Sequence, residues 1–592
     1  MAEAAADLGQ LPVWDLNDLY SGGIGSAPLK ADLERAAAEA KAFEAKCKGK
    51  LSGLTGAELG AAIAAYEKMQ DLTGRIGSFA GLTYSGDMTD PAIAQFFQSM
   101  QEKLNDIGTA LLFVTLELNR IEDADLEEKL KAPALAHYRP WLRDVRSFRP
   151  YQLSDDLEKL LHEKAIAGRN AWTRLFDETT AALRFDVDGK SLRSEEALHL
   201  LSDKDGAVRK SAALALGKTF TDNSRLFALV TNTLAKDKEI EDKWRKLPSP
   251  EASRHLSNCV EPEVVAALVK AVQDSYPRLS HRYYAMKAKW LGSDRLDYWD
   301  RNAPLPEDND RSIPWNEARD IVLSAYGRFS PELATIGKKF FDNNWIDAPS
   351  RAGKSPGAFA HPTVPSAHPY LLLNYQGKTR DVMTLAHELG HGVHQVLAAG
   401  QGPLMSDTPL TLAETASVFG EQLTFRGLLA AAPPERRKIM LAGKVEDMLN
   451  TVVRQIAFYT FEQRVHEARR TSELTPEQLG DIWIGVQSES LGPALRFDAG
   501  YRTFWCYIPH FIHSPFYVYA YAFGDCLVNA LYAVYQDAEQ GFQEKYFAML
   551  RAGGTMRHQE LLAPFGLNAA DPAFWSKGLG VIEGFIDELE KA

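Results

Sequence analysis

Helix-type periodicity runs through most of this chain, and it limits what the 592 residues can fold into more than any other feature. Segments 29–50, 56–66 and 91–118 are rich in Ala, Leu, Glu and Lys, with apolar residues near a 3.6-residue spacing. Such spacing gives a helix one apolar face that must be buried. The chain is also several times longer than a usual single domain. We therefore predict a mainly α fold that divides into at least two lobes.

A hairpin signal interrupts the helical pattern between residues 184 and 205. Short alternating apolar runs flank Asp188-Gly189, a pair that favours a tight turn between antiparallel strands. We place the lobe boundary here, with a helical N-terminal lobe over 1–200 and the domain that carries the chemistry over 201–592. Residues 203–217 resemble one unit of a HEAT-type helical repeat. No second copy follows at a period of about 40 residues, so a repeat scaffold is only an alternative.

The composition argues against several classes of protein. A net charge of −13 and a pI near 5.6, without a dense Lys/Arg tract, predict no nucleic-acid partner. No window offers the roughly 20 apolar residues that crossing a bilayer requires, so no membrane partner is expected. The N-terminal sequence lacks a secretory signal, and the four cysteines form no C-x-x-C pair. We expect a cytoplasmic protein, and its oligomeric state is not predicted.

Pro and Gly become frequent between residues 343 and 381, where a compact run of strand type follows, PYLLLNYQG. This run predicts a small β-sheet directly before the next helix. A sheet edge can bind an extended peptide by adding it as a further strand. A purely structural hairpin is the alternative, and the sequence does not separate the two.

A histidine pair on the helix predicted over 379–403 carries the clearest chemical signal. His387, Glu388 and His391 form the pattern H-E-x-x-H. Histidines four residues apart project from one face of a helix, so both imidazoles can bind one zinc ion. Glu388 lies beside that ion, where it can accept a proton from zinc-activated water and return it to the leaving amine. We predict one Zn²⁺ per chain; a histidine pair without metal is the alternative.

Two glycines within this helix require a structural reason. Gly390 and Gly392 each cost a helix about 1 kcal/mol relative to Ala. We expect another backbone or the substrate to approach closely at these positions. Thr379 is the predicted N-cap, and Gly400 and Pro403 are predicted to end the helix.

A catalytic zinc ion needs a third protein ligand, which H-E-x-x-H does not supply. The metzincin pattern is excluded, because this sequence has His394 and Leu397 where that class has Gly and His. The best candidate is Glu414 in TLAETASVFGEQLTF, with Glu421 seven residues later on the same face. Glu414 also fits a capping box with Thr411. Glu421 fits a solvated or supporting carboxylate better than a ligand. His394 is an alternative ligand, although a supporting role or plain exposure fits it better.

Three segments resemble the thimet oligopeptidase and oligoendopeptidase F family of zinc metallopeptidases, in its oligoendopeptidase F branch. They are AHELGHGVHQ, LAETASVFGEQL and IPHFIHSPFYVYAYAFG, in the family's order. The resemblance covers roughly residues 200–590, whereas the first 200 residues match only in general texture. It implies a two-lobed helical ellipsoid with a deep substrate channel that admits short unfolded peptides. It also implies that Glu414 is the third zinc ligand and that Glu421 supports the ligands.

The third of these segments is expected to stabilise the oxyanion that forms during peptide hydrolysis. The family uses a histidine and tyrosines for this purpose, which here implies His510, Tyr517 and Tyr521 as hydrogen-bond donors. The spacing between histidine and tyrosine differs among branches of the family. His513 and Tyr519 are therefore alternatives.

Taken together, these features predict a zinc-dependent endopeptidase that cuts internal bonds of short unfolded oligopeptides, with Glu388 as general base. A metallocarboxypeptidase is one alternative, because other helical peptidases combine H-E-x-x-H with a downstream glutamate. A catalytically silent, peptide-binding helical scaffold is another. Side-chain preference is not predicted, because residues far apart in the chain build a specificity pocket.

Overall fold

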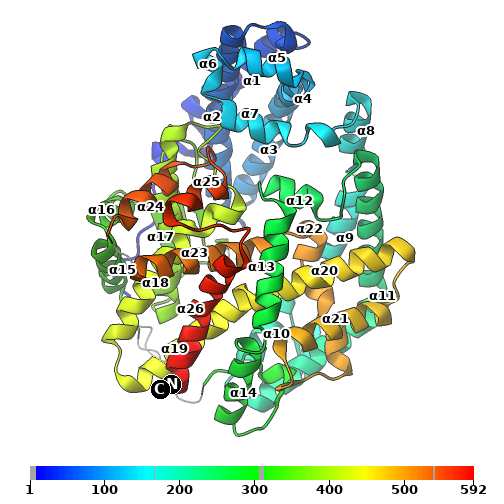
Figure 1. The fold of residues 1–592 in the computed structure, drawn as a ribbon, viewed down its shortest axis with the longest axis vertical. Coiled ribbons are helices and arrows are strands. Elements are labelled where there is room, and N and C mark those ends of the chain that lie inside the picture. The colour runs from blue at the N-terminus through cyan, green and yellow to red at the C-terminus, as the bar shows by residue number, and fades with distance from the viewer. Residues whose placement is uncertain (1–7, 166, 306–311, 356, 538–539, 592) are drawn as a thin grey trace. The chain divides into compact units, whose positions relative to one another are not determined.

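Helices dominate the computed structural model, and its strands are few and short (Figure 1). The structure describes residues 8–165, 167–305, 312–355, 357–537 and 540–591. The predicted mainly α fold is confirmed. Within the described ranges, no helix is both long enough and apolar enough to cross a membrane.

The chain forms two compact units, each assembled from three separate segments. The first unit comprises Met1–Pro150, Asp310–Ala431 and Val534–Leu567, and the second comprises Tyr151–Asn309, Ala432–Ala533 and Asn568–Ala592. Both units therefore combine parts of the chain that lie far apart in the sequence. The division into lobes 1–200 and 201–592 stays a prediction, as do the ellipsoid and its channel.

The N-terminal helices of the first unit begin where capping residues stand. Helix α1 (Ala27–Cys47) is capped by Ser26, whose hydroxyl accepts from the backbone of Leu29. Thr55 caps α2 in a capping box, and α3 follows Asp90. Helix α2 (Gly56–Gly86) extends well past the predicted 56–66, and the predicted helix 91–118 is divided into α3 (Pro91–Leu111) and α4 (Phe113–Arg120).

A three-stranded sheet in the first unit has the order β4-β6-β5. The central strand β6 (Tyr370–Tyr375) runs parallel to β4 (Ile346–Pro349) and antiparallel to β5 (Phe359–His361). Most of β6 is buried, which explains its near-continuous apolar sequence. Helix α17 (Thr379–Ala398) starts shortly after β6 ends. The predicted sheet beside the H-E-x-x-H helix is confirmed, and β5 lies at its edge.

The second unit contains the predicted hairpin. Strands β1 (Phe185–Val187) and β2 (Lys190–Leu192) pair antiparallel, and both turn residues, Asp188 and Gly189, have positive φ. The HEAT-like segment 203–217 does not form a repeat, because it leads into the single 40-residue helix α11 (Gly206–Arg245).

Four further helices of the second unit pack in pairs. The pairs are α19 (Pro434–Thr451) with α26 (Pro572–Lys591) and α20 (Val453–Thr471) with α21 (Pro476–Leu491). Cys259, Cys506 and Cys526 of this unit and Cys47 of the first are free thiols.

Candidate active site

The helix that carries the histidine pair begins one residue earlier than predicted. Helix α17 starts at Thr379, so its N-cap is Lys378 and the prediction of Thr379 as N-cap was wrong. Asp381 takes over the capping role, because its carboxylate accepts from the backbone N–H groups of Gln376 (2.8 Å) and Lys378 (3.0 Å). A carboxylate in the first helical turn also interacts favourably with the helix dipole.

Close packing of α17 against α18 (Leu410–Ala431) explains the two glycines. A Cβ at Gly390 would lie 2.5 Å from the carbonyl oxygen of Ala416 and 2.6 Å from the Cα of Ser417. The predicted approach of another backbone is thus confirmed at Gly390. At Gly392 the close neighbour is a side chain instead, because a Cβ there would lie 2.6 Å from the ring of Phe340.

His387, His391 and Glu414 present three potential ligand atoms within 4.8 Å of one another. The Glu414 Oε2 atom lies 3.4 Å from His387 Nε2 and 3.5 Å from His391 Nε2. Ligands at about 2.0–2.1 Å around a tetrahedral zinc ion lie roughly 3.3–3.4 Å apart. Two imidazole nitrogens and a carboxylate oxygen are also a donor set that zinc accepts. The residues therefore fit a zinc ion.

The capping-box interpretation of Glu414 does not describe its position. Helix α18 begins at Leu410, so Thr411 lies inside the first turn and not at the N-cap. The Glu414 carboxylate faces the histidines and accepts a 2.7 Å hydrogen bond from the hydroxyl of Ser417. That hydroxyl holds the carboxylate in place.

Further groups hold the two imidazole rings. Glu421 Oε2 lies 3.3 Å from His387 Nδ1, the nitrogen that does not face Glu414. The backbone of Ala413 interacts with His391 and also with His394. His394 is buried at 5% exposure, and burial lowers its pKa to about 4, so it is neutral. Its burial rules out plain exposure, and its supporting role stays a prediction.

The electrostatics of the group favour an ionised carboxylate. Burial raises the pKa of Glu414, but the two histidines outweigh burial and lower it. Burial lowers the pKa of His391 to about 4, which leaves this ring neutral, as a metal ligand must be. Burial also opposes protonation of His387, but three surrounding carboxylates raise its pKa to about 9.

Glu388 occupies a different environment from the three potential ligands. Its side chain is only 7% exposed, and burial raises its pKa to about 7. The backbone of Ala360, on the edge strand β5, donates a hydrogen bond to its carboxylate. A carboxyl group with such a pKa can both accept and release a proton near neutral pH.

The backbone N–H and carbonyl groups of Ala360 point away from the neighbouring strand β6. This residue lies opposite Leu371 of β6, but its N–H reaches Glu388 and its carbonyl accepts from Gln395 Nε2 at 3.4 Å. Both polar groups of this edge residue are thus directed toward α17. The edge of β5 that does not pair with β6 therefore lies against α17, the helix that carries the histidine pair.

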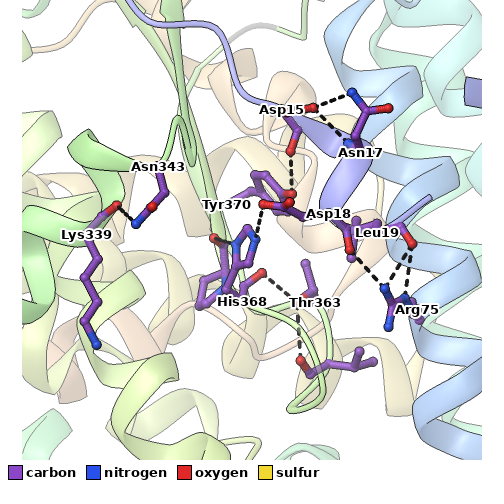
Figure 2. A network of polar contacts seen from close by, with 12 residues as sticks. Asp15, Asn17, Asp18, Leu19, Arg75, Lys339, Asn343, Thr363, His368 and Tyr370 are labelled. Carbon is purple, nitrogen blue, oxygen red and sulfur yellow. Dashed lines mark hydrogen bonds and ion pairs between the residues drawn. The ribbon is translucent and has the colours of Figure 1, made fainter. Parts of the chain in front are cut away.

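A cavity of about 580 Å³ opens next to His391 within the first unit. Two of its lining residues, Thr363 and His368, are drawn in Figure 2 together with Asp18 and Tyr370. The imidazole of His368 stacks on Trp345 at 4.0 Å and pairs with Asp18 at 3.0 Å. This part of the lining is therefore held in a fixed arrangement, and the cavity offers room for a bound group beside the ligand residues.

The predicted oxyanion residues lie together in the second unit. His510 Nε2 lies 3.3 Å from the hydroxyl of Tyr521, and the rings of Tyr517 and Tyr521 meet edge-on at 5.2 Å. All three side chains are partly exposed, so they can reach a bound molecule. Burial lowers the pKa of His510, with help from the positive charge of Arg454.

The two alternative residues have other partners. His513 Nε2 pairs with Asp177 at 2.7 Å. Tyr519 is fully buried, and its hydroxyl contacts His255 at 3.0 Å and Asn258 at 2.9 Å. The geometry therefore favours His510, Tyr517 and Tyr521 over His513 and Tyr519.

Sequence patterns missed several residues that shape these groups. Ser417, Gln395 and Ala360 act through hydrogen bonds that no local pattern indicates. Arg254 and Glu462, which contact the turn before Tyr517, belong to helices far away in the sequence. A signal existed for Ala360, because it lies in the Pro- and Gly-rich stretch 343–381 just before the predicted strand.

A histidine pair and a carboxylate that converge on one point, beside a buried glutamate in a mainly α fold, define a helical peptidase. The model of peptidase family M3 matches residues 199–581, and that of oligopeptidase F matches residues 117–185. The chain therefore belongs to peptidase family M3, which confirms the resemblance found in the sequence.

Individual relatives agree with this assignment. Oligopeptidase PepF of Bacillus subtilis is 27% identical over 561 residues, which are 92% of this chain and 82% of the relative. An oligoendopeptidase F homologue of Borreliella burgdorferi is 24% identical over 532 residues, which are 89% and 90% of the two chains. Both relatives are matched over most of their length.

Solved structures share the fold. The crystal structure of a Chlamydophila abortus protein gives a TM-score of 0.86 at 24% identity, covering 98% of this chain and 100% of the other. Oligoendopeptidase F of Enterococcus faecium gives a TM-score of 0.70 at 22% identity, covering 95% and 99%. The helical architecture is therefore that of known oligoendopeptidase F structures.

Proposed function

We propose that this chain is a zinc-dependent endopeptidase that hydrolyses internal bonds of short unfolded oligopeptides in the cytoplasm. The observation that carries the proposal is the convergence of His387, His391 and Glu414 beside the buried Glu388. Zinc, when bound, lowers the pKa of water to about 7 and polarises the scissile carbonyl. The remaining steps depend on residues of this chain.

The ligand residues are His387, His391 and Glu414, one ion per chain. Glu421 is proposed to accept a hydrogen bond from His387 Nδ1, which leaves Nε2 free to bind the metal and makes the imidazole more basic. Ser417 keeps the Glu414 carboxylate turned toward the rings. These partners keep the ligand atoms in position before the ion arrives.

Glu388 is proposed to carry the proton during hydrolysis. Its carboxylate accepts a proton from the attacking water, and it then donates this proton to the nitrogen of the departing amine. Support comes from its burial and from a pKa of about 7, which makes both transfers feasible at neutral pH.

The edge of β5 is proposed to hold the substrate in an extended conformation. A peptide added to this edge would bond to the N–H and carbonyl of Ala360, which now contact Glu388 and Gln395. Substrate binding would then release the Glu388 carboxylate from Ala360. An unfolded peptide can meet this requirement, whereas a folded protein has few segments free to pair.

His510, Tyr517 and Tyr521 are proposed to donate hydrogen bonds to the oxyanion of the tetrahedral intermediate. A donor aimed at this oxygen contributes about 2.7–4 kcal/mol to transition-state stabilisation. Support comes from the clustering and partial exposure of the three side chains.

The test combines metal analysis with cleavage of a peptide blocked at both ends. We expect one zinc ion per chain, internal cleavage, and loss of activity with a chelator that added zinc restores. Glu388→Gln should lower kcat by about 10²–10⁴-fold without loss of zinc, whereas the exposed Glu34→Gln should change nothing. Cleavage of free-ended peptides only would indicate a carboxypeptidase. Unchanged hydrolysis by Glu388→Gln would remove Glu388 from the mechanism.

A further inference from the structure

A strained turn precedes Tyr517 in the second unit. Ser514 to Tyr517 form a β-turn that is closed by a 3.1 Å hydrogen bond from the Tyr517 N–H to the Ser514 carbonyl. Pro515 occupies the second position and Phe516 the third, and φ of Phe516 is +60°. A positive φ at the third position defines the type II turn, which normally requires Gly there. A bulky aromatic residue in this conformation is strained.

Two side chains, a carboxyl group and a guanidinium group, hold the central peptide group of this turn. The Phe516 N–H donates to Glu462 Oε1 at 2.8 Å, and the Pro515 carbonyl accepts from Arg254 Nε at 3.3 Å. Both contacts involve one and the same peptide group. Glu462 comes from α20, and Arg254 comes from α12 (Ala252–Ser257). An acceptor oxygen on the N–H and a cation on the carbonyl oxygen thus fix the direction of this peptide plane.

The two contacts discriminate between turn types. Type I and type II turns differ mainly in the direction of the central peptide group, and type I gives the third residue the ordinary negative φ that Phe prefers. In a type I turn the carbonyl oxygen would face the acceptor oxygen of Glu462, and the N–H would face the Arg254 guanidinium. Both orientations are repulsive. The pair therefore selects the strained form.

Burial strengthens the arrangement. Glu462 is only 2% exposed. Its Oε1 accepts from the Phe516 N–H, and its Oε2 has no hydrogen-bond partner among the described residues. The Phe516 ring is fully buried and packs on His466 at 4.8 Å. The Arg254 guanidinium lies over the ring of Tyr517, 5.7 Å from its centre. Arg254 therefore contacts both the turn and the ring of Tyr517.

We propose that Glu462 and Arg254 are positioning residues, which hold the Pro515–Phe516 peptide group in the type II orientation and thereby aim the hydroxyl of Tyr517. The inference rests on the proposed function, because Tyr517 acts there as an oxyanion donor. Neither residue touches the substrate. This role explains both the unfavourable burial of Glu462 and the strained backbone of Phe516, because together they give the Tyr517 side chain a defined direction.

A double-mutant cycle with Tyr517→Phe tests the proposal in the full-length zinc-loaded enzyme. Tyr517→Phe should lower kcat by about 10²-fold. Glu462→Met, which removes the acceptor at similar volume, should lower kcat about tenfold with KM within twofold and zinc content unchanged. Adding Glu462→Met to Tyr517→Phe should cost nothing further. Glu462→Gln keeps an acceptor oxygen for the Phe516 N–H and should restore kcat to within threefold of wild type.

The outcomes separate the two proposals. If Tyr517→Phe retains full kcat, the oxyanion role of Tyr517 fails. If Tyr517→Phe loses activity but Glu462→Met does not, or if the two losses multiply, the positioning role fails. If Glu462→Met does not fold, Arg254→Met takes its place in the same cycle, with the same expectation. Arg464→Met is the matched control on α20, because Arg464 pairs with the exposed Glu489 and should leave kcat unchanged.

Discussion

The imidazole of His387 lies between two carboxylates that face its two nitrogens. Its Nε2 is 3.4 Å from Glu414, and its Nδ1 is 3.3 Å from Glu421. A histidine held at one nitrogen by a carboxylate has a fixed ring direction and a more basic free nitrogen. We therefore propose that Glu421 acts on metal binding without being a ligand.

Removing this support should weaken metal binding. We predict that Glu421→Ala lowers the affinity for zinc by about 10–100-fold, because the ring of His387 can then rotate and its free nitrogen becomes less basic. Competition against a chelator of known affinity measures the change. Glu34→Ala, an exposed residue of α1, is the control. Equal affinities of the two variants would show that Glu421 does not orient the ring.

Glu462 links protonation to stability. Burial raises its pKa from 4.5 to about 8, with a further rise from Glu251, whereas the Phe516 N–H, Arg254 and Lys238 lower it. Because the pKa of Glu462 is higher in the folded chain than in the unfolded chain, the folded chain binds more protons between pH 4.5 and about 8. The contribution of Glu462 to stability is present below about pH 4.5 and is lost as the pH rises through about 8.

This sign gives a measurable prediction. Gln at position 462 cannot ionise, so Glu462→Gln should become more stable relative to wild type as the pH rises from 6 to 9, by at most about 1.4 kcal/mol per pH unit. Denaturant unfolding of both proteins at several pH values measures the difference. A difference that does not vary with pH would mean that Glu462 has the same pKa in the folded and unfolded chain.

At the scale of elements, the contact between α17 and α18 brings the ligands together. His387 and His391 come from α17, and Glu414 comes from α18. The two helices approach most closely at Gly390, where a side chain would meet the backbone of Ala416. The distance between the helices thus sets the distance between the ligand atoms.

We predict that Gly390→Ala weakens both stability and zinc binding. The added Cβ would lie 2.5 Å from a carbonyl oxygen, so α18 must move and Glu414 must move with it. The loss should exceed the gain of about 1 kcal/mol that Ala normally gives in a helix. Gly81→Ala in α2 has open space around the added atom and should stabilise instead. Thermal unfolding and zinc titration of both variants check this, and a stabilised Gly390→Ala would contradict it.

Local patterns predicted the helices and the candidate metal ligands, but not the contacts of Ser417, Arg254 and Glu462. The H-E-x-x-H helix could be predicted because its ligands share one helical turn, and the hairpin at Asp188-Gly189 because two turn residues suffice. The prediction of Glu414 as a ligand depended on the family resemblance, because Thr411 and Glu414 also fit a capping box. Arg254 and Glu462 could not be predicted, because their contacts with the turn depend on how distant helices pack.

At the scale of the molecule, neither compact unit is continuous in sequence. Each unit takes segments from the N-terminal, middle and C-terminal parts of the chain. Composition and periodicity describe local structure, so they give no information about which distant segments pack together. The candidate ligands all fall in the first unit, and the candidate oxyanion donors all fall in the second. We therefore propose that metal binding depends on the first unit and oxyanion stabilisation on the second.

This separation predicts a local response to zinc. Zinc at one hundred times its dissociation constant stabilises the state that binds it by about 2.7 kcal/mol. Because the ligands connect α17 to α18, we expect slower amide hydrogen exchange in these two helices when zinc is added to metal-free protein. Helices α11 and α26 of the second unit should exchange at the same rate with and without the metal. Mass spectrometry of the labelled peptides measures both pairs of helices in one experiment, and equal protection of both would mean that the two units open together.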